Sequence, residues 1–88
     1  MSNENDVQNV SQRVIELAAE HGSVPVHSIT RETHFTNDLN YDSLTEVEFV
    51  MDLEDEFEIS VPDDITKSIQ TVGQAIDYTL DHLNPPGP

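Results

Sequence analysis

Apolar residues recur every three or four positions in separate stretches of this chain, which is the spacing of one helical face. The clearest stretch covers residues 7–21 and includes Val10 and Val14. Asp6 stands where an N-cap is expected, and Gly22 can end the helix in a left-handed conformation. This spacing predicts helices that bury one face against each other, and therefore an all-α fold.

A second helix is predicted over residues 43–57, and it carries apolar side chains on two sides. One side has the bulk of a core face and comprises Phe49, Val50, Leu53 and Phe57. The other side lies nearly opposite, among carboxylates, and comprises Leu44, Val47 and Met51. A surface helix needs only one core face, so we interpret the second set as an apolar strip facing solvent.

Two further helices are predicted near the C-terminus. Pro62 suits the first position of a short helix that ends at Ser68 and turns Ile65 inward. Thr71 and Gln74 match a capping box for a last helix. The buried face of that helix would comprise Val72, Ile76, Leu80 and Leu83.

Residues 23–41 show no period and predict a long loop. Its apolar residues should pin it across the bundle, and they are Val24, Val26, Ile29, Phe35 and Leu39. The prediction is thus a four-helix bundle, with three longer helices and one short one, in a single domain over residues 1–88. Residues 1–5 and 84–88 are predicted to be flexible tails.

Charge and composition restrict the classes of function. The 88 residues include 18 acids against three Lys and Arg, which gives a net charge of −15. Such a chain repels nucleic acid and anionic membranes and favours basic partner surfaces. The absence of Cys excludes disulfides, thiolate zinc sites and a cysteine nucleophile. Without a signal-peptide pattern or a membrane-length apolar stretch, we expect a cytoplasmic monomer that does not insert into membranes.

Ser43 stands where the irregular loop meets the second helix. The first amide groups of a helix lack intrahelical partners and the dipole favours negative charge there, so the position suits a phosphate-bearing group. The simpler interpretation is an N-cap, since Ser43 and Glu46 match a capping box, or Asp42 can cap instead. The adjacent apolar strip and the concentration of acids here favour the phosphate-bearing interpretation.

Two other classes of function are weighed against this one. A hydrolase serine would need a nucleophile elbow, which is absent around Ser43, and a nearby base. The four histidines are scattered, at His21, His27, His34 and His82. Asp38-x-Asn40-x-Asp42 resembles the opening of a calcium loop, but Ser43 replaces the required glycine and Phe49 the required glutamate. We predict no catalytic residue and no metal site, and keep a serine hydrolase and a divalent-cation-binding module as alternatives.

On these motifs the chain resembles the acyl carrier proteins from its first helix through Leu83. The strongest match is residues 38–57, and residues 61–64 and 71–78 match later segments. The resemblance implies a carrier rather than an enzyme. A phosphopantetheinyl transferase would attach a covalent 4′-phosphopantetheine arm from coenzyme A to Ser43, beside Asp42. The thiol of the arm would then carry acyl groups as thioesters.

The resemblance also implies roles for two further sets of residues. Partner enzymes of acyl-chain synthesis would dock through basic surfaces on Leu44, Val47, Glu48, Met51, Glu54 and Asp55. The acyl chain would be sheltered in a cavity lined or bordered by Phe49, Val50, Leu53, Phe57, Ile65 and Ile69. We therefore expect a role in fatty-acid or related acyl biosynthesis, with polyketide synthesis as the alternative.

Three positions depart from the usual pattern of the family. Asn40-Tyr41 replaces the usual Gly-Ala, and a tyrosine there is more familiar in carriers of aromatic polyketide pathways. Glu46 falls within the core sector of its helix, where a smaller residue is usual. It is interpreted either as a capping carboxylate or as a group that narrows or polarises the mouth of the cavity. Lys67 stands where an acid is common.

Overall fold

The computed structural model describes residues 3–83, which form four α-helices and one short 3-10 helix. The elements in chain order are α1 (Asn3–Gly22), η1 (Val26–Ser28), α2 (Ser43–Phe57), α3 (Asp63–Ser68) and α4 (Val72–His82). Over this range no β-strand forms, and a single isolated bridge pairs His34 with Thr71. The predicted all-α fold of three longer helices and a short one is confirmed. The predicted tail at residues 84–88 lies outside the described residues.

The predicted ends of the first helix were wrong at both sides. α1 begins at Asn3, so residues 3–5 are helical and Asp6 lies within the helix rather than capping it. Polar residues without Gly or Pro do not interrupt a helix, and acids in the first turn are favoured by the helix dipole. At the other end Gly22 is still helical, and Ser23 takes the left-handed conformation with φ 57°.

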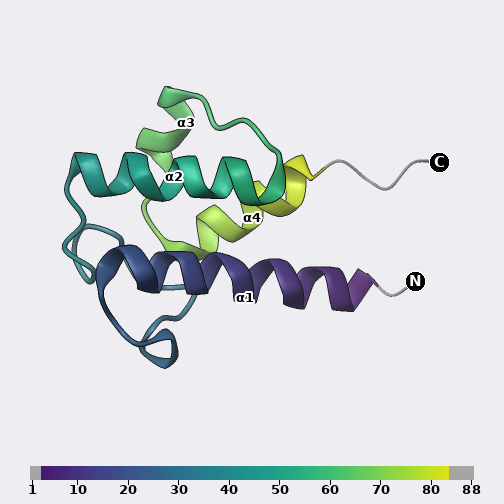
Figure 1. Cartoon of the computed structure of the whole chain (residues 1–88), viewed down its shortest axis with the longest axis horizontal. Coiled ribbons are helices and arrows are strands. Elements are labelled where there is room, and N and C mark those ends of the chain that lie inside the picture. Colours follow the sequence, from purple (N-terminus) through teal and green to yellow (C-terminus); the bar gives the residue numbers. More distant parts are fainter. Residues whose placement is uncertain (1–2, 84–88) are drawn as a thin grey trace.

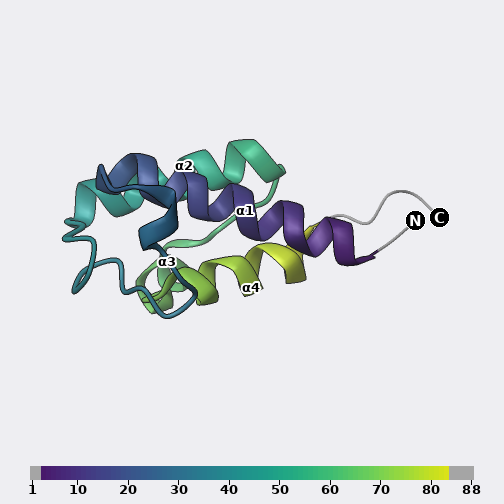
Figure 2. The same ribbon diagram turned by 90° about the horizontal axis from the view of Figure 1, so that it is seen from below.

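The helices pack around α1. Figure 1 shows α1 and α2 lying alongside each other and running in opposite directions, with α3 on the side of α2 away from α1. Figure 2 shows α4 lying beneath this pair, and α1 contacts both α2 and α4. The apolar faces predicted for these three helices therefore meet in one core.

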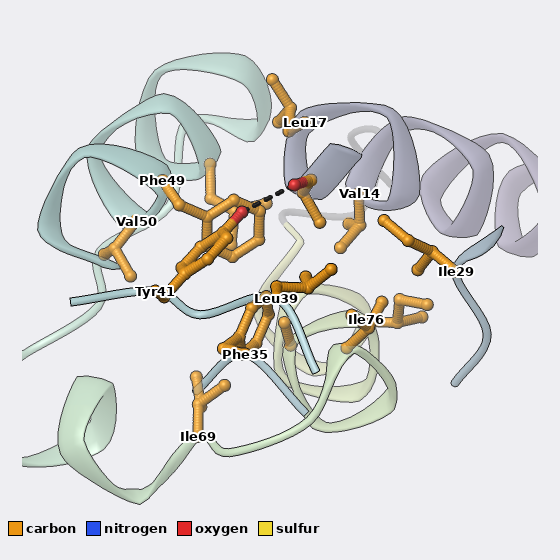
Figure 3. Packing of buried hydrophobic residues seen from close by; sticks show 14 of the residues in the cluster. Val14, Leu17, Ile29, Phe35, Leu39, Tyr41, Phe49, Val50, Ile69 and Ile76 are labelled. Carbon is orange, nitrogen blue, oxygen red and sulfur yellow. Dashed lines mark hydrogen bonds between the residues drawn. The ribbon is translucent and has the colours of Figure 1, made fainter. Parts of the chain in front are cut away.

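The long loop contributes much of that core. As predicted, Ile29, Phe35 and Leu39 are buried, and Val24 is half-buried. The predicted burial of Val26 is wrong, because this residue lies on η1 with 42% of its surface exposed. Figure 3 shows side chains from the loop meeting those of α1, α2 and α4 in a single cluster. The loop is therefore held by its own apolar side chains across one end of the bundle.

Backbone hydrogen bonds attach the same loop to the start of α4. The amide of Phe35 donates to the Gln70 carbonyl at 3.0 Å, and the amide of Val72 donates to the Thr33 carbonyl at 2.9 Å. The predicted capping box of α4 is confirmed, since Gln74 N donates to Thr71 Oγ1 at 3.2 Å and Thr71 N donates to Gln74 Oε1 at 3.1 Å. These bonds fix the loop before it reaches α2.

The two C-terminal helices differ from the prediction only in detail. Pro62 is the N-cap of α3 rather than its first residue. Ile65 is half-buried, while Ile69, just after the helix, is buried. On α4, Val72 and Ile76 have no exposed surface, and Leu80 is half-buried at the edge of the core.

Candidate functional site

Ser43 is the first residue of α2, and the capping is done by the residue before it. Asp42 has an extended backbone, and its Oδ1 accepts a hydrogen bond from the Thr45 amide at 2.8 Å. That amide is the main reason why the pKa of the Asp42 carboxyl is lowered, since it stabilises the charged form. Of the two capping alternatives, Asp42 is correct and the Ser43–Glu46 box does not form.

The hydroxyl of Ser43 is consequently free of a capping role. The side chain is exposed, and within residues 3–83 its hydroxyl makes no hydrogen bond. It projects at the start of a 15-residue helix, where a negative group is favoured by the dipole. An exposed, unbonded hydroxyl at this point fits the attachment of a phosphodiester.

Tyr41 holds the segment that delivers Ser43. Its side chain is only 6% exposed, and its hydroxyl donates to the Ala18 carbonyl of α1 at 2.7 Å (Figure 3). Its ring lies 5.2 Å from that of Phe35 and 6.1 Å from that of Phe49, centroid to centroid. Burial raises the pKa of the Tyr41 hydroxyl, because it disfavours the charged phenolate. Sequence reasoning missed this role, although a large aromatic residue in a polar loop was a signal for it.

The predicted solvent-facing apolar strip of α2 is confirmed in its position. Exposed fractions are 66% for Leu44, 47% for Val47 and 59% for Met51. Glu48 and Asp55 are exposed on the same helix. The strip thus offers apolar surface next to carboxylates, beginning directly beside Ser43.

Three acids of α2 are engaged within the chain instead, and one of them, Glu56, pairs with Arg13 of α1. Glu54, predicted to meet partners, is half-buried, and its Oε2 accepts a hydrogen bond from the Val61 amide at 2.7 Å. Asp52 lies 2.6 Å from Nε2 of His21, which ties α2 to the end of α1. The contact of Glu54 with the link before α3 gives it a structural role that its sequence position did not reveal.

The residues predicted to line an acyl cavity lie in three different settings. Phe49 and Leu53 are each 1% exposed and lie in the closely packed core, while Phe57 and Ile65 lie at its edge. The remaining two, Val50 and Ile69, each border a surface hollow. The six side chains therefore do not surround one shared hollow in this structure.

The first hollow, of about 320 Å³, lies between the loop, α2 and the end of α3. Its lining residues are His34, Thr36, Asn37, Glu46, Lys67, Ile69 and Gln70. The second, of about 170 Å³, lies between α2 and α3. Its lining residues are Val47, Val50, Met51, Glu54, Val61, Asp63 and Thr66.

Glu46 belongs to the first hollow. It is half-buried there, and burial raises the pKa of its carboxyl by disfavouring the charged form. The capping interpretation of Glu46 is wrong, because Asp42 provides the cap. Its place in the lining agrees with the other interpretation, a group that polarises the mouth of a cavity.

The alternative functions find little support in the geometry. No group of three or more His, Cys, Asp or Glu that could hold a metal ion occurs in the described part of the chain. The Asp38 carboxylate, the first position of the calcium-loop match, accepts a hydrogen bond from the His34 amide at 2.8 Å. His21 pairs with Asp52 rather than with Ser43. Neither a cation site nor a catalytic triad is assembled around the serine.

Comparison with known proteins decides between these possibilities. Residues 12–79 match the family described as the phosphopantetheine attachment site. The chain is 46% identical over 77 residues to the acyl carrier protein of Porphyromonas gingivalis, an alignment that covers 88% of this chain and 99% of that protein. The chain belongs to the acyl carrier protein family. This result supports the carrier interpretation over the hydrolase and the cation-binding module.

Two further relatives agree with this assignment. The acyl carrier protein of Lactobacillus johnsonii is 39% identical over 77 residues, with 88% of this chain and 96% of that protein covered. A solved structure of the acyl carrier protein from Enterococcus faecalis superposes with a TM-score of 0.75 at 35% identity, over 85% of this chain and 95% of that one. The cofactor of the family is phosphopantetheine, and the fold is the four-helix bundle. Among residues 3–83, no helix has the length and apolar character needed to cross a membrane.

Proposed function

We propose that Ser43 is the residue to which the phosphopantetheine arm of this acyl carrier protein is attached. The proposal rests on the different roles of two neighbouring side chains at the start of α2. Asp42 caps the helix through the Thr45 amide, and the neighbouring hydroxyl stays exposed and unbonded in the described structure. When bound, the arm supplies the thiol that holds an acyl group as a thioester. Fatty-acid or related acyl biosynthesis is the pathway that fits such a carrier.

The exposed strip of α2 is the surface that we propose for partner enzymes. Leu44, Val47 and Met51 provide apolar area, and Glu48 and Asp55 provide charge for basic partner surfaces. Charges at the rim of an interface mainly increase the rate of association and set its register. The phosphopantetheinyl transferase and the enzymes of acyl-chain synthesis would use this one face, because it borders the modified serine.

The chain would act as a carrier without catalysing a reaction itself. Its own residues have three tasks in this proposal. The hydroxyl of Ser43 is the attachment point, the Asp42 cap keeps the start of α2 in place, and Tyr41 holds the preceding segment on α1. Residence in the cytoplasm and the monomeric state stay predictions from the sequence.

Modification of the purified protein tests the attachment site. The apo protein is incubated with coenzyme A and a broad-specificity phosphopantetheinyl transferase, and its mass is measured. We expect the wild type to gain one arm, Ser43→Ala to gain none, and Ser60→Ala to gain one, because Ser60 is an exposed serine beyond the other end of α2. A Ser43→Ala protein that still gains the arm would exclude Ser43 as its site.

A further inference from the structure

We propose that the hollow lined by Glu46, Lys67 and Gln70 receives the thioester end of an acyl group that bears oxygen, such as a β-keto or β-hydroxy group. A saturated alkyl chain would be disfavoured there. The inference rests on the proposed attachment of the arm to Ser43 and deepens it by naming the chemical class of the cargo.

The position of the hollow makes it accessible to a group tethered at Ser43. Ser43 and Glu46 are three residues apart on α2, so their side chains lie on the same face, one turn from each other. Glu46 lines the hollow from α2, and Lys67 and Ile69 line it from α3 and the residue after it. A flexible arm that starts at Ser43 therefore begins beside the rim of this hollow.

The lining of the hollow is polar and its polar groups are not used by the protein. Six of its seven residues have polar side chains, and Ile69 is the exception. In the part of the chain that the structure describes, the side chains of Glu46, Lys67 and Gln70 make no hydrogen bond or ion pair. A saturated chain would remove them from water without giving them a partner, which is unfavourable. A keto or hydroxyl oxygen can bond to them instead.

Donors and acceptors are both present for such an oxygen. The ammonium of Lys67 and the amide of Gln70 donate hydrogen bonds. The carboxylate of Glu46 accepts hydrogen bonds, and burial raises its pKa by disfavouring the charged form. A β-keto oxygen needs a donor and a β-hydroxyl can use either kind of group, so both fit.

The side chains of the core behind the hollow are buried. Phe49 and Leu53 are each 1% exposed, and Ile76 has no exposed surface. The ring of Phe35 lies 5.0 Å from that of Phe49, centroid to centroid, behind the start of α2. A saturated chain would have to part these packed side chains, whereas an oxygenated group can stay in the hollow that already exists.

The test compares carriers that differ only in cargo. Isotope-labelled protein is first converted to the arm-bearing form and checked by mass, so a failure to attach the arm at Ser43 counts against the proposed function and not against this inference. The arm is then loaded with non-hydrolysable amide analogues of a saturated, a β-keto and a β-hydroxy acyl group of equal length. Backbone amide NMR shifts are recorded for each form and for the arm alone.

We expect the oxygenated groups to shift the amides of Glu46, Lys67, Ile69 and Gln70. Their docked population should exceed that of the saturated chain by about fivefold, which is the preference that one ordinary hydrogen bond gives. Glu46→Leu with Lys67→Leu should remove the preference, and Gln70→Leu alone should reduce it. Glu48→Leu, on the same helix but outside the hollow, should leave it unchanged.

Several results would overturn the inference. If the arm alone gives the same shifts at these amides, the arm and not the cargo occupies the hollow. Equal docking of the saturated chain, or saturated-chain shifts concentrated at Phe49, Leu53 and Ile76, would place the cargo in the core. A preference that survives in both the double variant and Gln70→Leu would show that these side chains do not cause it.

Discussion

Tyr41 shows how one side chain fixes the geometry of the modified segment. Its hydroxyl joins the loop before α2 to the Ala18 carbonyl of α1, and its ring packs on Phe35 and Phe49. The neighbouring Asn40 adopts a left-handed backbone with φ 58°, which turns the chain so that Tyr41 points inward. The same turn therefore directs the Tyr41 side chain into the core and leaves Ser43, two residues later, exposed.

Removing the hydroxyl of Tyr41 should destabilise the fold. Tyr41→Phe leaves the ring in place but removes a buried hydrogen bond to the Ala18 carbonyl, so we expect a loss of about 0.5–1.5 kcal/mol in the free energy of unfolding. Urea denaturation followed by circular dichroism measures it. Tyr78→Phe is the matched control, because its hydroxyl bonds to the Ser60 carbonyl at an exposed position. An equal or smaller loss for Tyr41→Phe than for Tyr78→Phe would contradict the role given to Tyr41.

Glu46 should make stability depend on pH in a defined direction. Its pKa in the folded protein is raised by burial above the ordinary value of 4.5. The stability it contributes is thus present below 4.5 and is lost as the pH rises through the folded-state pKa. Glu46→Gln has no charge to bury, so we expect it to be more stable than the wild type at neutral pH.

The difference between Glu46→Gln and the wild type should disappear in acid, where both side chains are neutral. Thermal unfolding of both proteins, measured from acidic to neutral pH, provides the comparison. Glu48→Gln, at an exposed position of the same helix, should show a smaller effect at neutral pH. A constant difference between Glu46→Gln and the wild type at every pH would rule out burial of charge as its cause.

At the level of elements, α2 combines a core face, a partner face and an anchor for the next segment. The anchor is Glu54, whose carboxylate accepts the Val61 amide at 2.7 Å and holds the link between α2 and α3. A Schellman-like end supports the same link, because Glu58 is left-handed with φ 54° and its amide donates to the Glu54 carbonyl. The Glu54 side chain therefore helps to hold α3, a helix of six residues, beside α2.

Loss of that anchor should loosen α3. Glu54→Ala leaves the Val61 amide without its partner, and we expect a loss of about 1–3 kcal/mol in stability together with faster amide exchange in α3. Asp55→Ala, an adjacent exposed acid, should stay within about 0.5 kcal/mol of the wild type. Hydrogen exchange and urea denaturation measure the two effects. Unchanged protection of α3 in Glu54→Ala would show that the anchor is elsewhere.

The sequence predicted the helices well because their apolar spacing is a local property. It also predicted the exposed strip of α2, since the two sectors follow from 100° per residue alone. It did not predict that Tyr41 reaches Ala18 or that Glu54 reaches the Val61 amide, because these contacts join segments whose separation no local pattern specifies. The choice of Asp42 over Ser43 as the cap was likewise open, because both side chains are capable of it.

At the scale of the whole molecule, the main feature is an excess of negative charge. The net charge is −15, and of the three Lys and Arg residues two are engaged, Arg13 with Glu16 and Glu56, and Arg31 with Asp77. An uncompensated negative field of this size attracts basic partners over a distance and is screened by salt. The exposed acids of α2 place part of that field next to Ser43.

Reversing charge on α2 should slow attachment of the arm. We expect Glu48→Lys with Asp55→Lys to reduce the second-order rate of arm transfer about tenfold at low salt, and less at high salt. Glu20→Lys with Asp81→Lys makes the same change in net charge at exposed positions on α1 and α4. Stopped-time mass spectrometry gives the rates. Equal slowing by both pairs would mean that net charge alone, rather than the face beside Ser43, governs the encounter.

The proposed carrier function depends on the Ser43 hydroxyl being the site of the prosthetic arm. Tandem mass spectrometry of peptides from the arm-bearing protein locates the modification directly. We expect the added mass on Ser43 and on no other residue. An arm found on a different serine or threonine would contradict it.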